Sequence, residues 1–254
     1  MRTRTFSRHA AFTALLTLLC LPLSFGAVMT QINYIDGAGE GFNDPSLGAQ
    51  RKAALEFAVD FWANQLEGTV TIQIDAEFNP LGGTMSSAVL AFAGPENVAR
   101  DFTGAPQSGT WYAIALANQL RGADLAPSNV DLSITFNSDV DNGTVLGSID
   151  WYYGTDANPG SDVDLVTTAL HELGHGLGFL DLIDSGTGAW FSGFPDIYGR
   201  QLTRTGVGDF DAISNAQRLA AECLSLGASA ESERSGERKY RNWLVLSGQL
   251  SAVR

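Results

Sequence analysis

Apolar residues recur at helical spacing between positions 55 and 66 of the chain. They lie three or four residues apart, as they do on the buried face of an amphipathic helix: Leu55, Ala58, Val59, Trp62 and Leu66. Pro45 and Ser46 suit the start of such a helix, and Gly68 suits its end. The pattern therefore predicts a helix that ends before Gly68.

Alternation of apolar and polar residues marks two later segments as half-buried strands. In residues 69–78 the apolar positions are Val70, Ile72, Ile74, Ala76 and Phe78. In residues 130–136 they are Val130, Leu132, Ile134 and Phe136. Residues 86–93 form a weaker strand candidate.

A second helical pattern begins near Asp162 or Asp164, because acidic residues favour a helix N-terminus. Its apolar stripe consists of Val166, Leu170, Leu173 and Leu177. Residues 186–199 are glycine-rich and read as a loop, residues 211–224 look helical, and residues 227–254 read as an irregular tail. The order of helices and strands predicts an α+β fold in a single domain over residues 27–226.

The first 26 residues have the layout of a secretory signal peptide. Three arginines precede an apolar run over residues 10–23, and small residues follow it. The run is about 14 residues long, whereas a membrane-spanning helix needs roughly 20. A retained anchor is the alternative. The sequence therefore predicts an exported protein, secreted or periplasmic, without stable membrane association after cleavage.

Charge and cysteine content narrow the classes of function. The 254 residues carry a net charge of −13, which becomes −16 if residues 1–26 and their three arginines are removed. Such an acidic chain is not expected to bind nucleic acid, which requires a basic surface. Of the two cysteines only Cys223 would remain, so no internal disulfide is expected. We expect a monomer.

The candidate chemistry lies in residues 171–181, which read HELGHGLGFLD. His171 and His175 are four residues apart, so on a helix both imidazoles project from one face and can bind one Zn²⁺. Glu172 is placed to reach a metal-bound water without binding the metal. Gly178 permits a left-handed turn, after which Asp181 can return towards the metal as a third ligand. Apart from His9, these are the only histidines in the chain.

Residues 162–181 resemble the active-site helix of the zincin metallopeptidases, most closely the metzincins, which include the matrixins. The third ligand is usually His in those enzymes, and Asp at this place resembles the snapalysin-type bacterial enzymes. FNDP at 42–45 and FPDIY at 194–198 are similar to segments of secreted bacterial metallopeptidases that carry a protease-associated domain. The resemblance implies a zincin-like domain with a mixed twisted sheet and zinc-dependent peptidase activity on protein or peptide substrates.

Two features depart from that family. Metzincins have a methionine turn beneath the metal, whereas no Met follows position 85 in this chain. The third ligand is also open, because Asp196, Asp184 and, in the manner of the gluzincins, Glu222 are rivals of Asp181. Each rival has the alternative of being an ordinary solvated carboxylate.

The implied reaction is metal-assisted hydrolysis of a peptide bond, with Glu172 as general base on a zinc-bound water. Tyr198 is a candidate hydrogen-bond donor to the oxyanion, with a purely structural tyrosine as the alternative. Ca²⁺ is a second cofactor candidate, at a loose site among Asp139, Asp141, Asp156 and Asp162.

Two other classes of function remain open at this point. One is a non-catalytic zincin-like protein that binds metal or a partner. The other is a secreted structural or adhesive domain whose acidic loops bind calcium.

Overall fold

The computed structural model describes residues 27–221. The predicted signal peptide, Glu222, Cys223 and the predicted tail lie outside the described residues.

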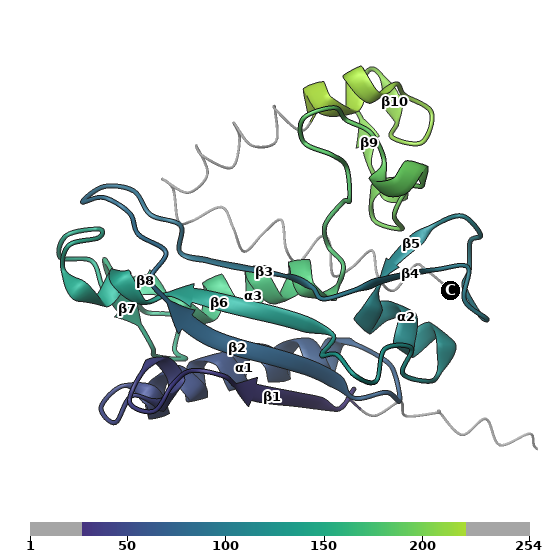
Figure 1. Cartoon of the computed structure of the whole chain (residues 1–254). Helices are drawn as coiled ribbons and strands as arrows, with labels where there is room; N and C mark the ends of the chain where they lie inside the picture. The colour runs from purple at the N-terminus through teal and green to yellow at the C-terminus, as the bar shows by residue number, and fades with distance from the viewer. Residues whose placement is uncertain (1–26, 222–254) are drawn as a thin grey trace, which may run out of the picture.

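A four-stranded mixed sheet forms the centre of the molecule (Figure 1). Its strand order is β1 (Thr30–Tyr34), β2 (Ile72–Asn79), β6 (Leu132–Asn137) and β3 (Ala91–Pro95). The first three strands are parallel, with Ile32 opposite Ile74 and Ala76 opposite Ile134, whereas β3 runs antiparallel to β6. Because β3 ends the sheet, its outer edge pairs with no other strand of the described chain.

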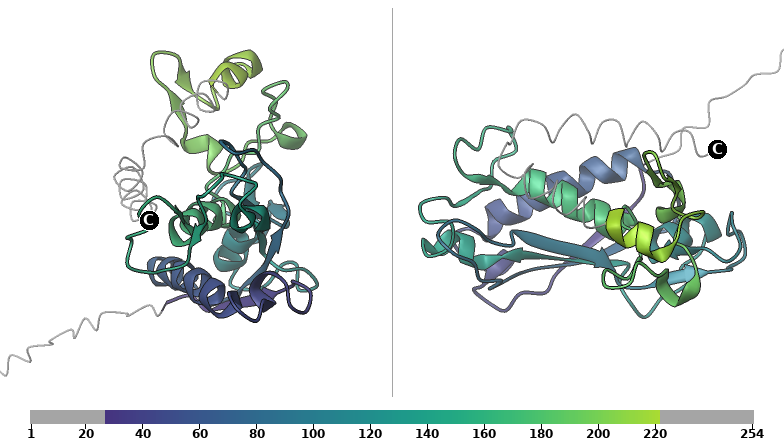
Figure 2. Two further views of the ribbon diagram at one scale, coloured as in Figure 1. Left: turned by 90° about the vertical axis from the view of Figure 1, so that its left-hand side faces the viewer. Right: turned by 90° about the horizontal axis from the view of Figure 1, so that it is seen from above.

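Two helices cover one face of this sheet (Figure 2). They are α1 (Gly48–Gln65) and α3 (Leu165–Leu177). The apolar residues of β2 alternate with polar ones and are buried on the helical side, as the alternation predicts. The Trp62 indole of α1 donates a hydrogen bond to the Leu170 carbonyl of α3 at 3.1 Å. The two helices and the sheet therefore share one core.

Shorter elements surround this core. The remaining helices are η1 (Gly41–Asn43), α2 (Ile114–Arg121), η2 (Ser138–Asn142), η3 (Phe191–Gly193) and η4 (Gly199–Gln201). The remaining strands are β4 (Val98–Arg100), β5 (Trp111–Ala113), β7 (Trp151–Tyr152), β8 (Val163–Asp164), β9 (Thr203–Arg204) and β10 (Gly208–Asp209). A last helix begins at 215 and continues to the end of the described residues. Figure 1 shows residues 181–221 as a lobe beyond β5.

The structure confirms the predicted α+β class and both long helices. It corrects several boundaries. β2 starts at Ile72 and β6 at Leu132, later than the expected starts at 69 and 130. The strand expected over 86–93 starts only at Ala91, and residues 84–87 form a turn closed by a bridge between Thr84 and Ser87. The helix expected from 211 starts at 215, after a turn in which the Asp209 carbonyl accepts a bond from Ile213. No helix of the described part is long and apolar enough to cross a membrane.

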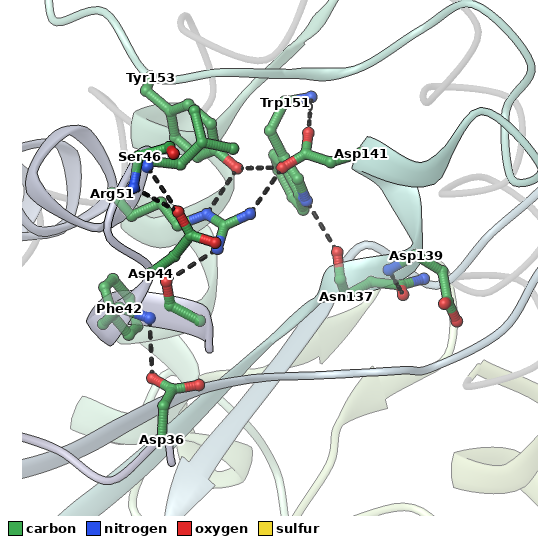
Figure 3. A network of polar contacts seen from close by, with 12 residues as sticks. Asp36, Phe42, Asp44, Ser46, Arg51, Asn137, Asp139, Asp141, Trp151 and Tyr153 are labelled. Carbon is green, nitrogen blue, oxygen red and sulfur yellow. Dashed lines mark hydrogen bonds and ion pairs between the residues drawn. The ribbon is translucent and has the colours of Figure 1, made fainter. Parts of the chain in front are cut away.

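A buried polar cluster joins α1 to the segment that follows β6 (Figure 3). The Arg51 guanidinium pairs with the Asp141 carboxylate at 2.9 Å, and its Nε donates to the Tyr153 hydroxyl at 2.9 Å. The same guanidinium lies over the Phe78 ring, 4.4 Å from its centroid. These contacts fix the loops at the carboxyl end of the parallel strands.

Candidate metal centre

The helix that carries the HELGH sequence is defined by a cap at each end. The Asp164 side chain accepts hydrogen bonds from Val166 N at 3.0 Å and from the Thr167 hydroxyl at 2.8 Å. Gly178 closes the helix in a left-handed conformation, with φ +110°, and donates to the carbonyls of Gly174 and His175. The sequence predicted both ends, and Asp164 rather than Asp162 is the capping residue.

Two glycines bring this helix close to its neighbours. A Cβ on Gly176 would lie 3.0 Å from the Cβ of Leu132, so the small residue lets α3 pack directly against β6. A Cβ on Gly178 would lie 3.1 Å from the Cβ of Ala113 in β5. The histidine helix is therefore held between the sheet and the β5 strand.

His171 and His175 lie half-buried on one face of α3, as their spacing predicts. Their Nε2 atoms are 3.1 Å apart. Two nitrogens bound to one tetrahedral Zn²⁺ at about 2.0–2.1 Å would be about 3.3 Å apart. The pair therefore has the separation that a shared metal requires, although an imidazole–imidazole hydrogen bond has a similar length.

The second nitrogen of His175 favours the ligand interpretation. His175 Nδ1 lies 2.9 Å from the carbonyl oxygen of Phe179, which can only accept a hydrogen bond. Nδ1 therefore carries a proton, and in the neutral imidazole Nε2 presents its lone pair towards His171. Metal-binding histidines commonly donate their other N–H to a backbone carbonyl in this way. The donor chemistry of the pair thus fits zinc.

Glu172 follows His171 directly on α3 and is half-buried. Successive residues of a helix are rotated by roughly 100°, so its side chain leaves the helix at the border of the histidine face. The role of Glu172 as general base stays a prediction.

The third ligand is less well defined. Asp181 lies in the turn after Gly178, where its Oδ1 accepts a hydrogen bond from Ile183 N at 3.1 Å. Within residues 27–221, no group of three or more His, Cys, Asp or Glu side chains is assembled closely enough to hold a metal ion. The structure places the two histidines side by side. The role of Asp181 as the third ligand stays a prediction.

The two described rivals of Asp181 both use their carboxylates elsewhere. Asp184 is exposed and caps its own turn, since Oδ1 accepts from Thr187 N at 2.8 Å; bonds from Thr187 hold the pKa of this carboxyl below its usual value. Asp196 is 3% exposed, and its two oxygens accept the N–H groups of Leu182 and Gly199. Glu222 lies outside the described residues.

Tyr198 lies near the C-terminal end of α3. Its ring is 6.2 Å from that of Phe179, edge to face. Burial raises the pKa of the Tyr198 phenol, and the negative charges of Asp181 and Asp196 raise it further. Tyr198 therefore keeps its proton at neutral pH and can act as a donor.

The predicted calcium ligands are distributed over separate contacts. Asp141 pairs with Arg51, and Asp139 Oδ2 accepts from Gly82 N at 2.9 Å. Asp156 accepts a short bond from the Tyr152 hydroxyl, and Asp162 accepts from Asp150 N at 3.4 Å. Each carboxylate has a local structural role, and a calcium site stays an untested prediction.

The carbonyl of Phe179 is the contact that the sequence could not reveal, because a backbone acceptor leaves no residue-type signal. Only the spacing of four between His175 and Phe179, across the predicted Gly178 turn, hints at it.

No protein-family model matches the chain, and searches of curated proteins and of solved structures gave no match. The resemblance to the zincins therefore depends on the motif residues themselves and on the geometry described above.

Proposed function

We propose that the protein is a zinc-dependent metalloendopeptidase with a zincin-like fold. The observation that carries this proposal is the pair of histidine Nε2 atoms 3.1 Å apart on α3, next to Glu172 in sequence. The proposal includes a catalytic domain over residues 27–226. Export follows from the signal-like pattern of residues 1–26, and the acidic charge argues against a nucleic-acid substrate.

In this proposal the residues of α3 and of the turn after it have separate roles. His171 and His175 hold the metal, with Asp181 as the third ligand, and the Phe179 carbonyl keeps His175 in the correct tautomer. Zinc at this site would act as a Lewis acid, which would polarise a peptide carbonyl and lower the pKa of water to near neutrality. Glu172 accepts the proton of the attacking water and returns it to the departing amine.

The free edge of β3 supports a polypeptide as the substrate class. β3 contacts α3 and is the terminal strand of the sheet on that side (Figure 1). An edge strand offers unpaired N–H and C=O groups to an extended peptide, which can add to the sheet by main-chain hydrogen bonds. A peptide bound in this way would pass close to the histidine helix.

The test is hydrolysis of an unfolded protein by the purified chain without residues 1–26. A chelator should abolish the activity and zinc should restore it. Glu172→Gln keeps the size of the side chain but removes the base, so we expect the rate to fall about a hundredfold or more. Glu67→Gln, which changes an exposed carboxylate after α1, is the control and should retain full activity.

The alternative is a zincin-like protein that binds metal without turnover. The absence of an assembled third ligand among residues 27–221 favours it. Stoichiometric zinc in a folded chain that cleaves no substrate would select this alternative. A folded chain that binds no zinc, or one whose zinc content is unchanged by His171→Ala, would overturn both.

A further inference from the structure

The buried carboxylate of Asp196 lies between two segments that carry proposed site residues. It belongs to the lobe beyond β5 and is 3% exposed. Its Oδ2 accepts the N–H of Leu182 at 2.8 Å, and its Oδ1 accepts the N–H of Gly199 at 2.6 Å. A buried charge normally has a cationic partner, whereas this one is held by backbone donors.

The two donors have a specific place in the sequence. Leu182 directly follows Asp181, and Gly199 directly follows Tyr198. One carboxylate therefore fixes the peptide group immediately after the proposed third ligand and the one immediately after the proposed oxyanion donor. Burial raises the pKa of the Asp196 carboxyl, and the negative charge of Asp181 raises it further.

The backbone on either side of Asp196 is tied to the core. The Pro195 carbonyl accepts the N–H of Trp111 at 2.9 Å, and Ile197 N donates to the Trp111 carbonyl at 2.9 Å. Trp111 belongs to β5, whose Ala113 lies so close to the end of α3 that a Cβ on Gly178 would be 3.1 Å from the Ala113 Cβ. The backbone around Asp196 is thus hydrogen-bonded to β5, which packs against the end of α3.

We propose that Asp196 is a positioning residue, which determines where the side chains of Asp181 and Tyr198 lie relative to the histidine pair. This inference rests on the proposed function. It assigns to Asp196 a role different from that of a metal ligand, because hydrogen-bond donors occupy both of its oxygens. Loss of either bond would release the turn after Asp181 or the turn after Tyr198.

Asp196→Asn tests the role with little change in volume. An amide has one oxygen, and its NH₂ group would face a backbone N–H, so one of the two bonds must be lost. The matched control is Asp44→Asn, since Asp44 Oδ1 also accepts two backbone N–H groups, those of Ser46 and Leu47, in the segment before α1. The full chain without residues 1–26 is used for both variants.

The probe is Co²⁺, whose visible absorption reports the ligands around the metal. We expect Asp196→Asn to weaken cobalt affinity by about 10- to 100-fold, the usual effect of losing a residue that orients a metal ligand, and to change the absorption band. Asp44→Asn should leave both unchanged. Circular dichroism establishes that each variant is folded.

A double-mutant cycle separates positioning from general loosening of the fold. If Asp196 acts through Asp181, then Asp196→Asn should have little further effect on cobalt affinity in an Asp181→Ala background. Equal affinity and equal spectra for the wild type and a folded Asp196→Asn would overturn the inference and leave the proposed function intact. Absence of cobalt binding by the wild type would overturn the proposed function, and the inference with it.

If Asp196→Asn does not fold, Asp196→Glu takes its place. The longer side chain keeps both acceptors but displaces them by one methylene, so a smaller shift of the same cobalt band is expected. An unchanged band in a folded Asp196→Glu would count against the positioning role.

Discussion

At the scale of single residues, Gly178 links the end of α3 to the turn that carries Asp181. Its φ of +110° is a conformation that a side chain resists, and a Cβ would lie 3.1 Å from that of Ala113. We therefore expect Gly178→Ala to lower the free energy of unfolding by about 1–3 kcal/mol. Urea denaturation followed by circular dichroism measures the change.

The control for this prediction is Gly94→Ala in β3. Gly94 has no atoms within 4 Å of the position that a Cβ would take, and its φ is not in the left-handed region. Alanine should be neutral there or stabilise slightly. An equal loss of stability in both variants would mean that the strained turn at Gly178 is not the cause.

At the scale of elements, α3 depends on its N-terminal cap. The Asp164 carboxylate accepts the N–H of Val166 and the hydroxyl of Thr167, which satisfies part of the first turn. Asp164→Ala should cost about 0.5–2 kcal/mol of stability, whereas Asp164→Asn should retain most of the cap because it keeps an acceptor oxygen. Thermal unfolding of the two variants distinguishes them, and similar losses would contradict a capping role.

Among the elements, the sequence predicts those with long regular patterns. α1, α3, β2 and β6 carry long regular periodicities, and their apolar positions form the core. β1, α2, β4 and β5 are short, and burial of their residues depends on neighbours distant in sequence. No local sequence pattern predicts these short elements.

Only part of the candidate site can be predicted from the sequence. His171, Glu172 and His175 lie within one helical turn, so a local spacing suffices to predict that the two histidines converge. The position of Asp181 depends instead on a bond from Leu182 to Asp196, and the orientation of His175 depends on a backbone carbonyl. Such contacts arise from the tertiary fold, and residue types alone do not indicate them.

At the scale of the whole molecule, the Arg51 cluster joins α1 to the loops beyond the sheet. The side chains of Arg51 and Asp141 are only 7% and 17% exposed, so removal of the arginine would leave a carboxylate with its negative charge largely buried. We expect Arg51→Met to lower the free energy of unfolding by about 3–5 kcal/mol. The analogous Arg200→Met change breaks a more exposed pair with Asp211, at 27% and 36%, and should cost no more than about 1 kcal/mol. Denaturant titration of both variants measures the difference, and comparable losses would show that the cluster does not anchor α1.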